Sequence, residues 1–225
     1  MTTFTIGADE FRALVNPVLP MAGTDVYLPA INSVLIEGRG KWLSATATDR
    51  FRVGIKRIAK TPTDDDTATE WPEFKANIPL RSVKSMLTTF KSPRGSLPAR
   101  ITFTIEGGTL TVEASGAFDL FDAARFTHQL EPGEFPGVRA VIRQALETPE
   151  GERMASVGIN PAYMADFKAS GAKTLRVLVG AAQKPLVVTD GEGFIGALMP
   201  RGTAVADEDW TDFLAAPKKA DEKAA

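Results

Sequence analysis

One local pattern recurs three times along the 225-residue chain: a short strand, an amphipathic helix and then a meander of strands. The copies begin at Phe4, at Phe74 and at about Met154, and they share no obvious sequence identity. Repeats of this size are supersecondary units that complete a core only by packing against a neighbouring unit. The chain is therefore expected to act through its shape and surfaces.

The first unit starts with an alternating strand at residues 4–6, followed by Asp9 in position to cap a helix. Apolar residues recur along that helix at helical spacing, namely Phe11, Leu14, Val15 and Val18. Short turns then separate three predicted strands, at residues 34–37, 42–47 and 52–58.

The second unit repeats this plan, with a strand at 74–78, a helix at 79–90 and strands at 100–106, 109–114 and 117–126. The third has a predicted strand at 154–159 and a helix that Asn160 and Pro161 begin. Its meander is expected at residues 174–179, 185–189 and 193–199.

These patterns predict an α+β fold of repeated half-domains, with helices on one face of antiparallel sheets. Half-units 1–62 and 73–128 would bury their helices against one another and form one complete domain, residues 1–128. A linker at 129–153, a single half-domain at 154–202 and a charged tail at 203–225 would follow. A half-domain without its mate exposes an apolar helix and a sheet edge, so we expect something to cover it.

Composition limits the classes of function. The chain has no cysteine, which removes disulfides and thiolate chemistry, and it lacks the apolar runs of a signal peptide or a membrane helix. We therefore expect a cytoplasmic protein with no membrane partner. A net charge of -2 argues against a protein that binds nucleic acid over its whole surface, but it leaves room for a local basic face.

No catalytic constellation is evident, so no enzyme activity, cofactor or metal is predicted. The single histidine, His128, has no nucleophile motif near it and is interpreted as a surface residue. The segment 38–41 resembles a phosphate-binding loop only faintly and is interpreted as a hairpin turn. The acidic run 64–66 lacks the glycine and distal glutamate of a calcium loop, which favours a solvated linker.

Several motifs are more specific. The stretches LPAINSVLI at 28–36 and ATATDRFRV at 45–53 resemble the middle domain of the bacterial sliding clamp, the beta subunit of DNA polymerase III. The stretch EFPGVRAVI at 134–142 resembles that family's link to its last domain. Three further segments resemble the final half-domain in the same order, at residues 159–163, 184–187 and 197–201.

The resemblance implies a ring that encircles double-stranded DNA without sequence preference and docks short peptides of a DNA polymerase and other replication proteins. The docking cleft would lie between the middle and last domains. By motif, its residues would be Thr48, Arg50, Phe51, Arg52, Val53, Pro136, Ala140, Val141, Asn160, Tyr163, Pro185, Met199 and Pro200. Without the resemblance, the aromatic residues and methionine among them would be interpreted as core.

A basic stripe is the candidate DNA contact. On the second helix, cations recur opposite the apolar face, and a loop tyrosine resembles a DNA-touching loop of the family. The candidates are Arg12, Tyr27, Arg81, Lys84, Lys91, Lys168 and Lys173, for each of which a plain solvated side chain is the alternative.

The chain also departs from the family pattern. The family's first domain and the first half of its last domain have no counterpart here, so three half-units per chain replace the family's six. Twelve half-units close the family's ring, which predicts a homo-oligomer, specifically a tetramer, and leaves room for a clamp loader. The alternative is a non-encircling, clamp-like decoy that binds clamp-binding partners. A further hypothesis places Trp210, Phe213 and Leu214 of the tail in the cleft.

Overall fold

The computed structural model describes residues 1–62, 66–90, 99–115, 125–152 and 156–201. The tail, Lys91 and the beginnings of the strands predicted at 117–126 and 154–159 lie outside these residues. The described helices are α1 (Ala8–Val15), α2 (Leu80–Thr89), α3 (Val138–Leu146) and α4 (Pro161–Ala165), with short 3₁₀ turns η1 (Leu19–Met21), η2 (Glu150–Glu152) and η3 (Asp166–Ser170).

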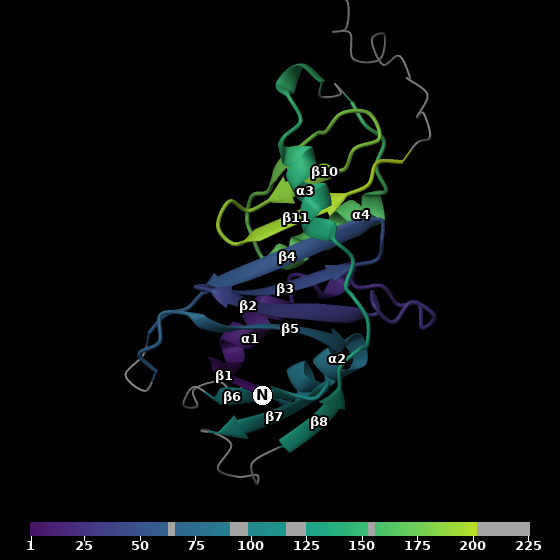
Figure 1. Cartoon of the computed structure of the whole chain (residues 1–225). Coiled ribbons are helices and arrows are strands. Elements are labelled where there is room, and N and C mark those ends of the chain that lie inside the picture. The colour runs from purple at the N-terminus through teal and green to yellow at the C-terminus, as the bar shows by residue number, and fades with distance from the viewer. Residues whose placement is uncertain (63–65, 91–98, 116–124, 153–155, 202–225) are drawn as a thin grey trace, which may run out of the picture.

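The described strands form two antiparallel sheets (Figure 1). The smaller has the order β1-β6-β7-β8, with bounds β1 (Thr2–Gly7), β6 (Arg100–Glu106), β7 (Thr109–Ser115) and β8 (Arg125–Gln129). The larger has the order β5-β2-β3-β4-β11-β10-β9, with bounds β5 (Trp71–Pro79), β2 (Ser33–Gly40), β3 (Trp42–Thr48), β4 (Arg52–Ala59), β11 (Phe194–Leu198), β10 (Leu186–Thr189) and β9 (Arg176–Leu178).

The first two units exchange their opening strands. β1 precedes α1 in the first unit but pairs with β6 of the second, and β5 precedes α2 in the second unit but pairs with β2 of the first. Each unit therefore supplies an edge strand to the sheet of the other. Neither sheet can form completely from one unit.

One core connects these two units. Phe4 stacks on Phe74 and Phe103 with ring centroids 4.7 and 4.9 Å apart, which joins strands of both sheets. The apolar stripes of α1 and α2 pack in the same cluster, as expected for amphipathic helices at 3.6-residue periodicity. Phe11 of α1 lies 5.1 Å from Phe103 between ring centroids, so helix and sheet share this aromatic centre.

The third unit extends the larger sheet through β11, which pairs with β4 over five residues. Side chains alternate across this part of the sheet. On one face Phe194 packs against Phe167 of η3, with ring centroids 6.2 Å apart. On the other face Ile142 and Ala145 of α3 pack on Val53 and neighbouring apolar residues.

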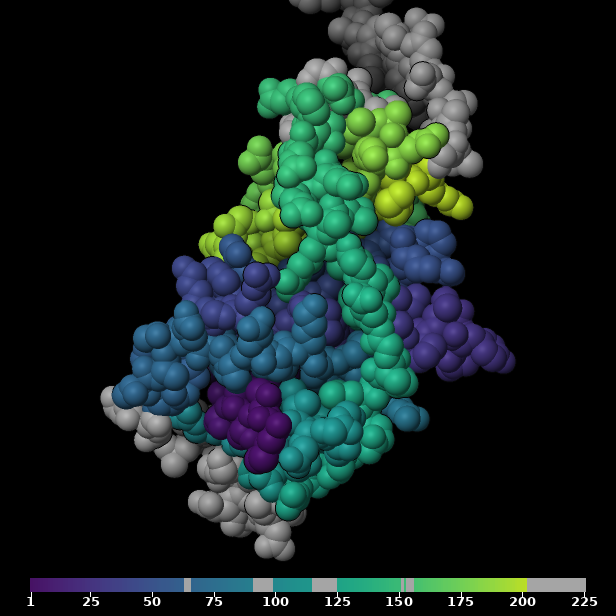
Figure 2. Space-filling model, in the orientation of Figure 1, coloured from purple at the N-terminus to yellow at the C-terminus, as the bar shows by residue number. Residues whose placement is uncertain are grey.

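The third unit and its linker differ from the expected elements in two places. The predicted linker contains α3, whose apolar residues at 138, 142 and 145 have helical spacing, and this helix covers the sheet face opposite η3. The strand predicted at 154–159 is absent from residues 156–160, which are extended without a paired strand. Figure 2 shows the linker crossing the front of the molecule between β8 and α3.

The predicted α+β class is confirmed, with the helices of all three units on the sheet faces that line the main core. Gly107 and Gly108 form the β6–β7 turn with φ of 54° and 80°, values that favour glycine. Among the described residues, no helix is long and apolar enough to cross a membrane.

Candidate functional site

The candidate site is built on the bend between β3 and β4, residues 48–52. The Asp49 carboxylate accepts hydrogen bonds from the backbone N–H groups of Phe51 and Arg52, both at 3.0 Å. The Thr48 hydroxyl donates to the carbonyl of Arg52 at 2.7 Å and accepts from the Arg50 N–H at 3.2 Å. These bonds hold Arg50 at a φ of 80°, a conformation that is uncommon for residues other than glycine.

Arg52 ties this bend to the third unit. Its guanidinium pairs with Asp49 at 3.0 Å and with Asp166 of η3, and it donates to the carbonyl of Pro20 at 2.8 Å. The same group lies 4.3 Å from the centre of the Tyr163 ring. Arg52 therefore mainly stabilises the contact between the bend and the α4–η3 segment, because its guanidinium donors already bind these carboxylates and this carbonyl.

The end of β11 lies directly against the bend. Leu198 pairs with Arg52, and the Met199 N–H donates to the Phe51 carbonyl at 2.8 Å. The two segments on which the sequence interpretation depends are therefore neighbours in one sheet. Phe51 and Met199 remain 51% and 38% exposed, which leaves an aromatic ring and a thioether at the surface.

A cavity of about 180 Å³ opens beside these two side chains. Its walls come from the bend, from the residues that lead into α3 and from the third unit. We call this cavity the cleft. Its lining residues are Thr48, Arg50, Phe51, Arg52, Val53, Pro136, Val138, Val141, Pro185, Ala197 and Met199.

Nine of the thirteen residues predicted for the cleft are in this lining. Of the other four, Asn160 accepts a hydrogen bond from the Ala162 N–H and caps α4, and Tyr163 stacks near Phe51 at 6.2 Å between ring centroids. Ala140 is exposed on α3 and Pro200 is half-buried beside Met199. Val138 and Ala197 also line the cleft, although the sequence interpretation missed them; each lies within a matched motif.

The chain resembles known proteins in sequence and in fold. No protein-family model matches the chain. The beta sliding clamp of Micrococcus luteus is 27% identical over 145 residues, which are 63% of this chain and 41% of the Micrococcus protein. The beta subunit of DNA polymerase III from Thermotoga maritima has a TM-score of 0.68 at 14% identity, over 91% of this chain and 66% of that one.

The chain has the fold of the bacterial sliding clamp. The subunit from Pseudomonas aeruginosa matches with a TM-score of 0.65 at 15% identity, over 89% of this chain and 66% of that one. The resemblance deduced from the motifs is thus confirmed. In the sequence match the chain spans well under two-thirds of its clamp relative.

The clamp fold places the candidate DNA-contacting residues at several points. Arg81 and Lys84 are exposed on α2, Lys168 and Lys173 are exposed at η3 and after it, and Tyr27 is 88% exposed in the loop before β2. Arg12 is different, since its guanidinium donates to the carbonyls of Leu87 and Phe90 at 2.6 and 3.2 Å. Arg12 therefore caps the end of α2.

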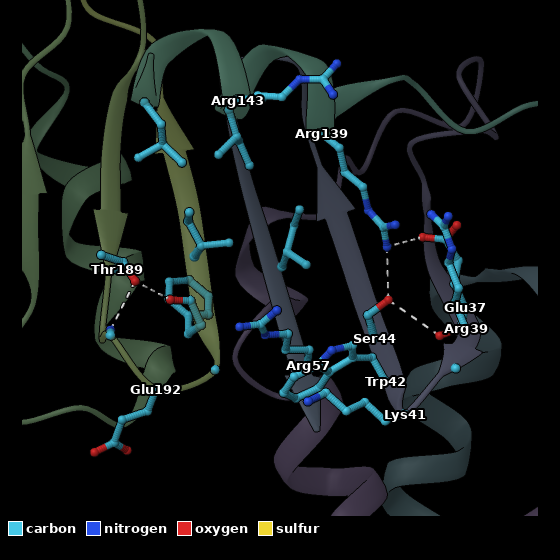
Figure 3. Close-up of a pocket in the computed structure, with 18 residues that line it drawn as sticks. Glu37, Arg39, Lys41, Trp42, Ser44, Arg57, Arg139, Arg143, Thr189 and Glu192 are labelled. Carbon is cyan, nitrogen blue, oxygen red and sulfur yellow. Dashed lines mark hydrogen bonds and ion pairs between the residues drawn. The ribbon is translucent and has the colours of Figure 1, made fainter. Parts of the chain in front are cut away.

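A larger cavity, of about 790 Å³, lies between α3 and the same sheet (Figure 3). Arg139 closes one side by donating to Glu37 at 2.5 Å and to Ser44 at 3.1 Å. Arg57 lies over the Trp42 ring at 4.1 Å from its centre. Nothing in the sequence pointed to this cavity, because it depends on α3 lying across the sheet.

Two further candidates from the sequence are the histidine and the acidic run 64–66. His128 is half-buried rather than a surface residue, because its ring stacks on that of Phe126 with centroids 6.3 Å apart. Burial, and to a smaller extent the nearby charge of Arg81, lowers the pKa of His128. Asp66 pairs with Lys60 at 2.5 Å, while the rest of the acidic run lies outside the described residues. Within the described ranges, no group of acidic or histidine residues could hold a metal.

Proposed function

We propose that this chain is a sliding clamp, a polymerase processivity factor that encircles duplex DNA and docks peptides of replication proteins in the cleft. The observation that supports it is that three segments line one apolar cavity: the bend, the residues that lead into α3, and the end of β11. A thioether and an aromatic ring beside a few polar anchors suit a peptide bearing leucine or phenylalanine. The protein acts by tethering its partners at high local concentration, not by catalysis.

The DNA contact in this proposal is electrostatic and independent of sequence. Arg81, Lys84, Lys168 and Lys173 are exposed and have the chemistry to contact phosphates without reading bases. A few such contacts make binding weak and sensitive to salt, which is compatible with sliding. Three half-units per chain give a twelve-unit ring when four chains assemble, and a clamp loader would then open that ring.

Peptide binding is tested with a fluorescent peptide that carries a leucine and a phenylalanine. Met199→Ala and Phe51→Ala should each weaken binding at least tenfold, because buried anchors dominate such interfaces. Leu146→Ala is the matched control, since Leu146 is 43% exposed on α3 but lies outside the cleft. Equal affinity of all four proteins for the peptide would remove the cleft from the proposal.

Encirclement is tested on linear duplex DNA, onto which a ring can thread from a free end. The protein is added to DNA with one blocked end, the second end is then blocked, and the salt concentration is raised. Retention should require both blocks, because salt removes phosphate contacts but not a topological link. Retention that ignores the blocks, or peptide binding without retention, would favour a clamp-like interaction protein that does not encircle DNA.

A further inference from the structure

The exchange of opening strands follows one register rule in both complete units. In each unit the residue immediately before the helix N-cap pairs with the second residue of the receiving strand. Ile6 precedes the Gly7 cap and pairs with Ile101, and Ile78 precedes the Pro79 cap and pairs with Val34. All four side chains are aliphatic and at most 2% exposed.

The third unit has both halves of this arrangement, but no mate for it lies among the described residues. Its helix cap is Asn160, so the counterpart of Ile6 and Ile78 is Ile159. Its receiving strand is β9, whose second residue is Val177. β9 is the free edge of the larger sheet, and Val177 is 41% exposed, whereas Ile101 and Val34 are fully buried.

The hydrogen-bond pattern of the sheet shows that the backbone N–H and C=O groups of Val177 in β9 point toward the free edge. The Met199 N–H bonds to Phe51 of the bend, and the Asp190 N–H bonds to the Phe194 carbonyl at 3.2 Å. Bonding alternates along antiparallel strands, so these contacts and the registers of β11, β10 and β9 fix which residues bond to which neighbour. The backbone groups of Val177 point away from β10, toward the free edge.

The opening segment of the third unit is presented in the same way. In the second unit the Glu131 N–H donates to Asn77, two residues before the helix cap, at 2.8 Å. In the third unit the Arg201 N–H donates to Gly158, also two residues before the cap, at 2.9 Å. By the same alternation, Ile159 then directs its backbone groups away from its own unit.

We propose that a second copy of this chain completes the third unit by reciprocal strand exchange. Residues 156–160 of one copy pair antiparallel with β9 of the other, with Ile159 opposite the partner's Val177. Because each copy gives one strand and receives one, the contact is two-fold symmetric and closes at two chains. Pro161 lacks the N–H that Ala8 and Leu80 donate at this position, so the exchanged pair has one hydrogen bond fewer.

The absence of cysteine allows a direct test by disulfide trapping. The double variant Ile159→Cys, Val177→Cys should give a doubly linked covalent dimer under mild oxidation, because directly opposed residues lie within disulfide reach. Ile159→Cys, Leu178→Cys is the offset control and should give at least fivefold less dimer. Linked monomer, no linkage, or equal dimer from both variants would overturn the exchange.

A second measurement does not depend on oxidation. The mass of the wild-type chain in solution should correspond to two chains or a multiple of two, and a monomer at micromolar concentration would contradict the inference. Val177→Pro removes an outward N–H without touching the bonds to β10 and should halve the mass. Val177→Lys should do the same by placing a charge at the contact, so a folding defect of one variant does not decide the result.

This inference extends the proposed clamp by supplying its two-fold contact, but the two fail separately. A dimer that neither binds the peptide nor stays on end-blocked DNA would refute the clamp and leave strand exchange intact. A chain that binds the peptide as a monomer would refute strand exchange and leave the cleft intact.

Discussion

The paired units and the third unit use the same plan but bury very different amounts of it. α1 and α2 each bury four residues, whereas α4 buries none and η3 buries only Phe167. The first two units cover one another's helices and sheet edges. The third packs on the first through β4, and the outer edge of β9 pairs with no other described strand. Its buried residues Phe167, Phe194 and Leu198 belong to the core of the first two units and do not form a separate one.

The difference teaches where the cleft gets its shape. One wall belongs to the bend after β3, which is anchored in the paired units, and another belongs to the end of β11 in the third unit. Because a locally weak element can open without global unfolding, we expect the third unit to adjust more than the bend when a ligand binds in the cleft.

The largest test of this comparison removes one buried phenylalanine from each region. Phe103 and Phe167 are 1% and 0% exposed, so either change to alanine should cost about 3–5 kcal/mol. Phe103→Ala should lower protection from hydrogen exchange throughout the chain. Phe167→Ala should lower it mainly in residues 161–198, because the paired units keep their own core.

Phe51→Ala is the matched control for both variants, since Phe51 is 51% exposed and its removal leaves no buried void. Its effect on the free energy of unfolding should be within about 1 kcal/mol. Equal loss of protection in both regions of Phe167→Ala would show that the three units unfold as one, and the comparison would then fail.

The local sequence pattern predicted most of the elements, because the spacing of apolar residues in each helix and strand shows which face of that element is buried. Phe11 and Leu14 mark the buried stripe of α1, and Gly107 and Gly108 mark a hairpin turn. The exchange of β1 and β5 was not predictable from pattern, because alternation shows that a strand has a buried face but not which sheet receives it.

The residues of the cleft were predicted from family motifs and not from the hydrophobic pattern of the sequence. Phe51 and Met199 would pass for core residues in any pattern analysis, and only their exposure beside a cavity distinguishes them. α3 was missed because Pro136 and Gly137 look like linker residues, although the spacing of Val138, Ile142 and Ala145 carried a helical signal.

A smaller effect is expected from Gly196→Ala on β11. A Cβ at this position would lie 2.5 Å from the Phe167 ring and 2.6 Å from the Val53 carbonyl, so both the packing and the backbone of the junction would have to move. We expect a loss of about 3 kcal/mol, at the upper end for overpacking, measured by denaturant unfolding. Gly137→Ala is the control, because no atom lies within 4 Å of its Cβ and the change should be within about 0.5 kcal/mol.

The smallest effect concerns the β10–β11 turn, which contains Gly191 at a φ of 78° and is also held by a buried carboxylate, unlike the β6–β7 turn with its two glycines. Asp190 accepts hydrogen bonds from the N–H groups of Glu192, Gly193 and Phe194 at 2.8–2.9 Å and pairs with Lys56 of β4 at 3.4 Å. Burial alone would raise the pKa of Asp190, but these donors and the Lys56 charge outweigh burial and lower it from 3.8 to about 2.

Because the folded-state pKa of Asp190 is depressed, its stabilisation is complete above pH 3.8 and is lost as the pH falls toward 2. The shift corresponds to about 2 kcal/mol. Asp190→Asn keeps one acceptor oxygen but removes the charge, so wild type and variant should differ most near neutral pH and converge in acid. Hydrogen exchange shows where stability is lost. As the pH falls, residues 186–198 should lose protection from exchange before the first two units do. If residues 100–115 lose protection first or at the same pH, the first two units are at least as sensitive to acid, and the charge of Asp190 does not determine which region opens first.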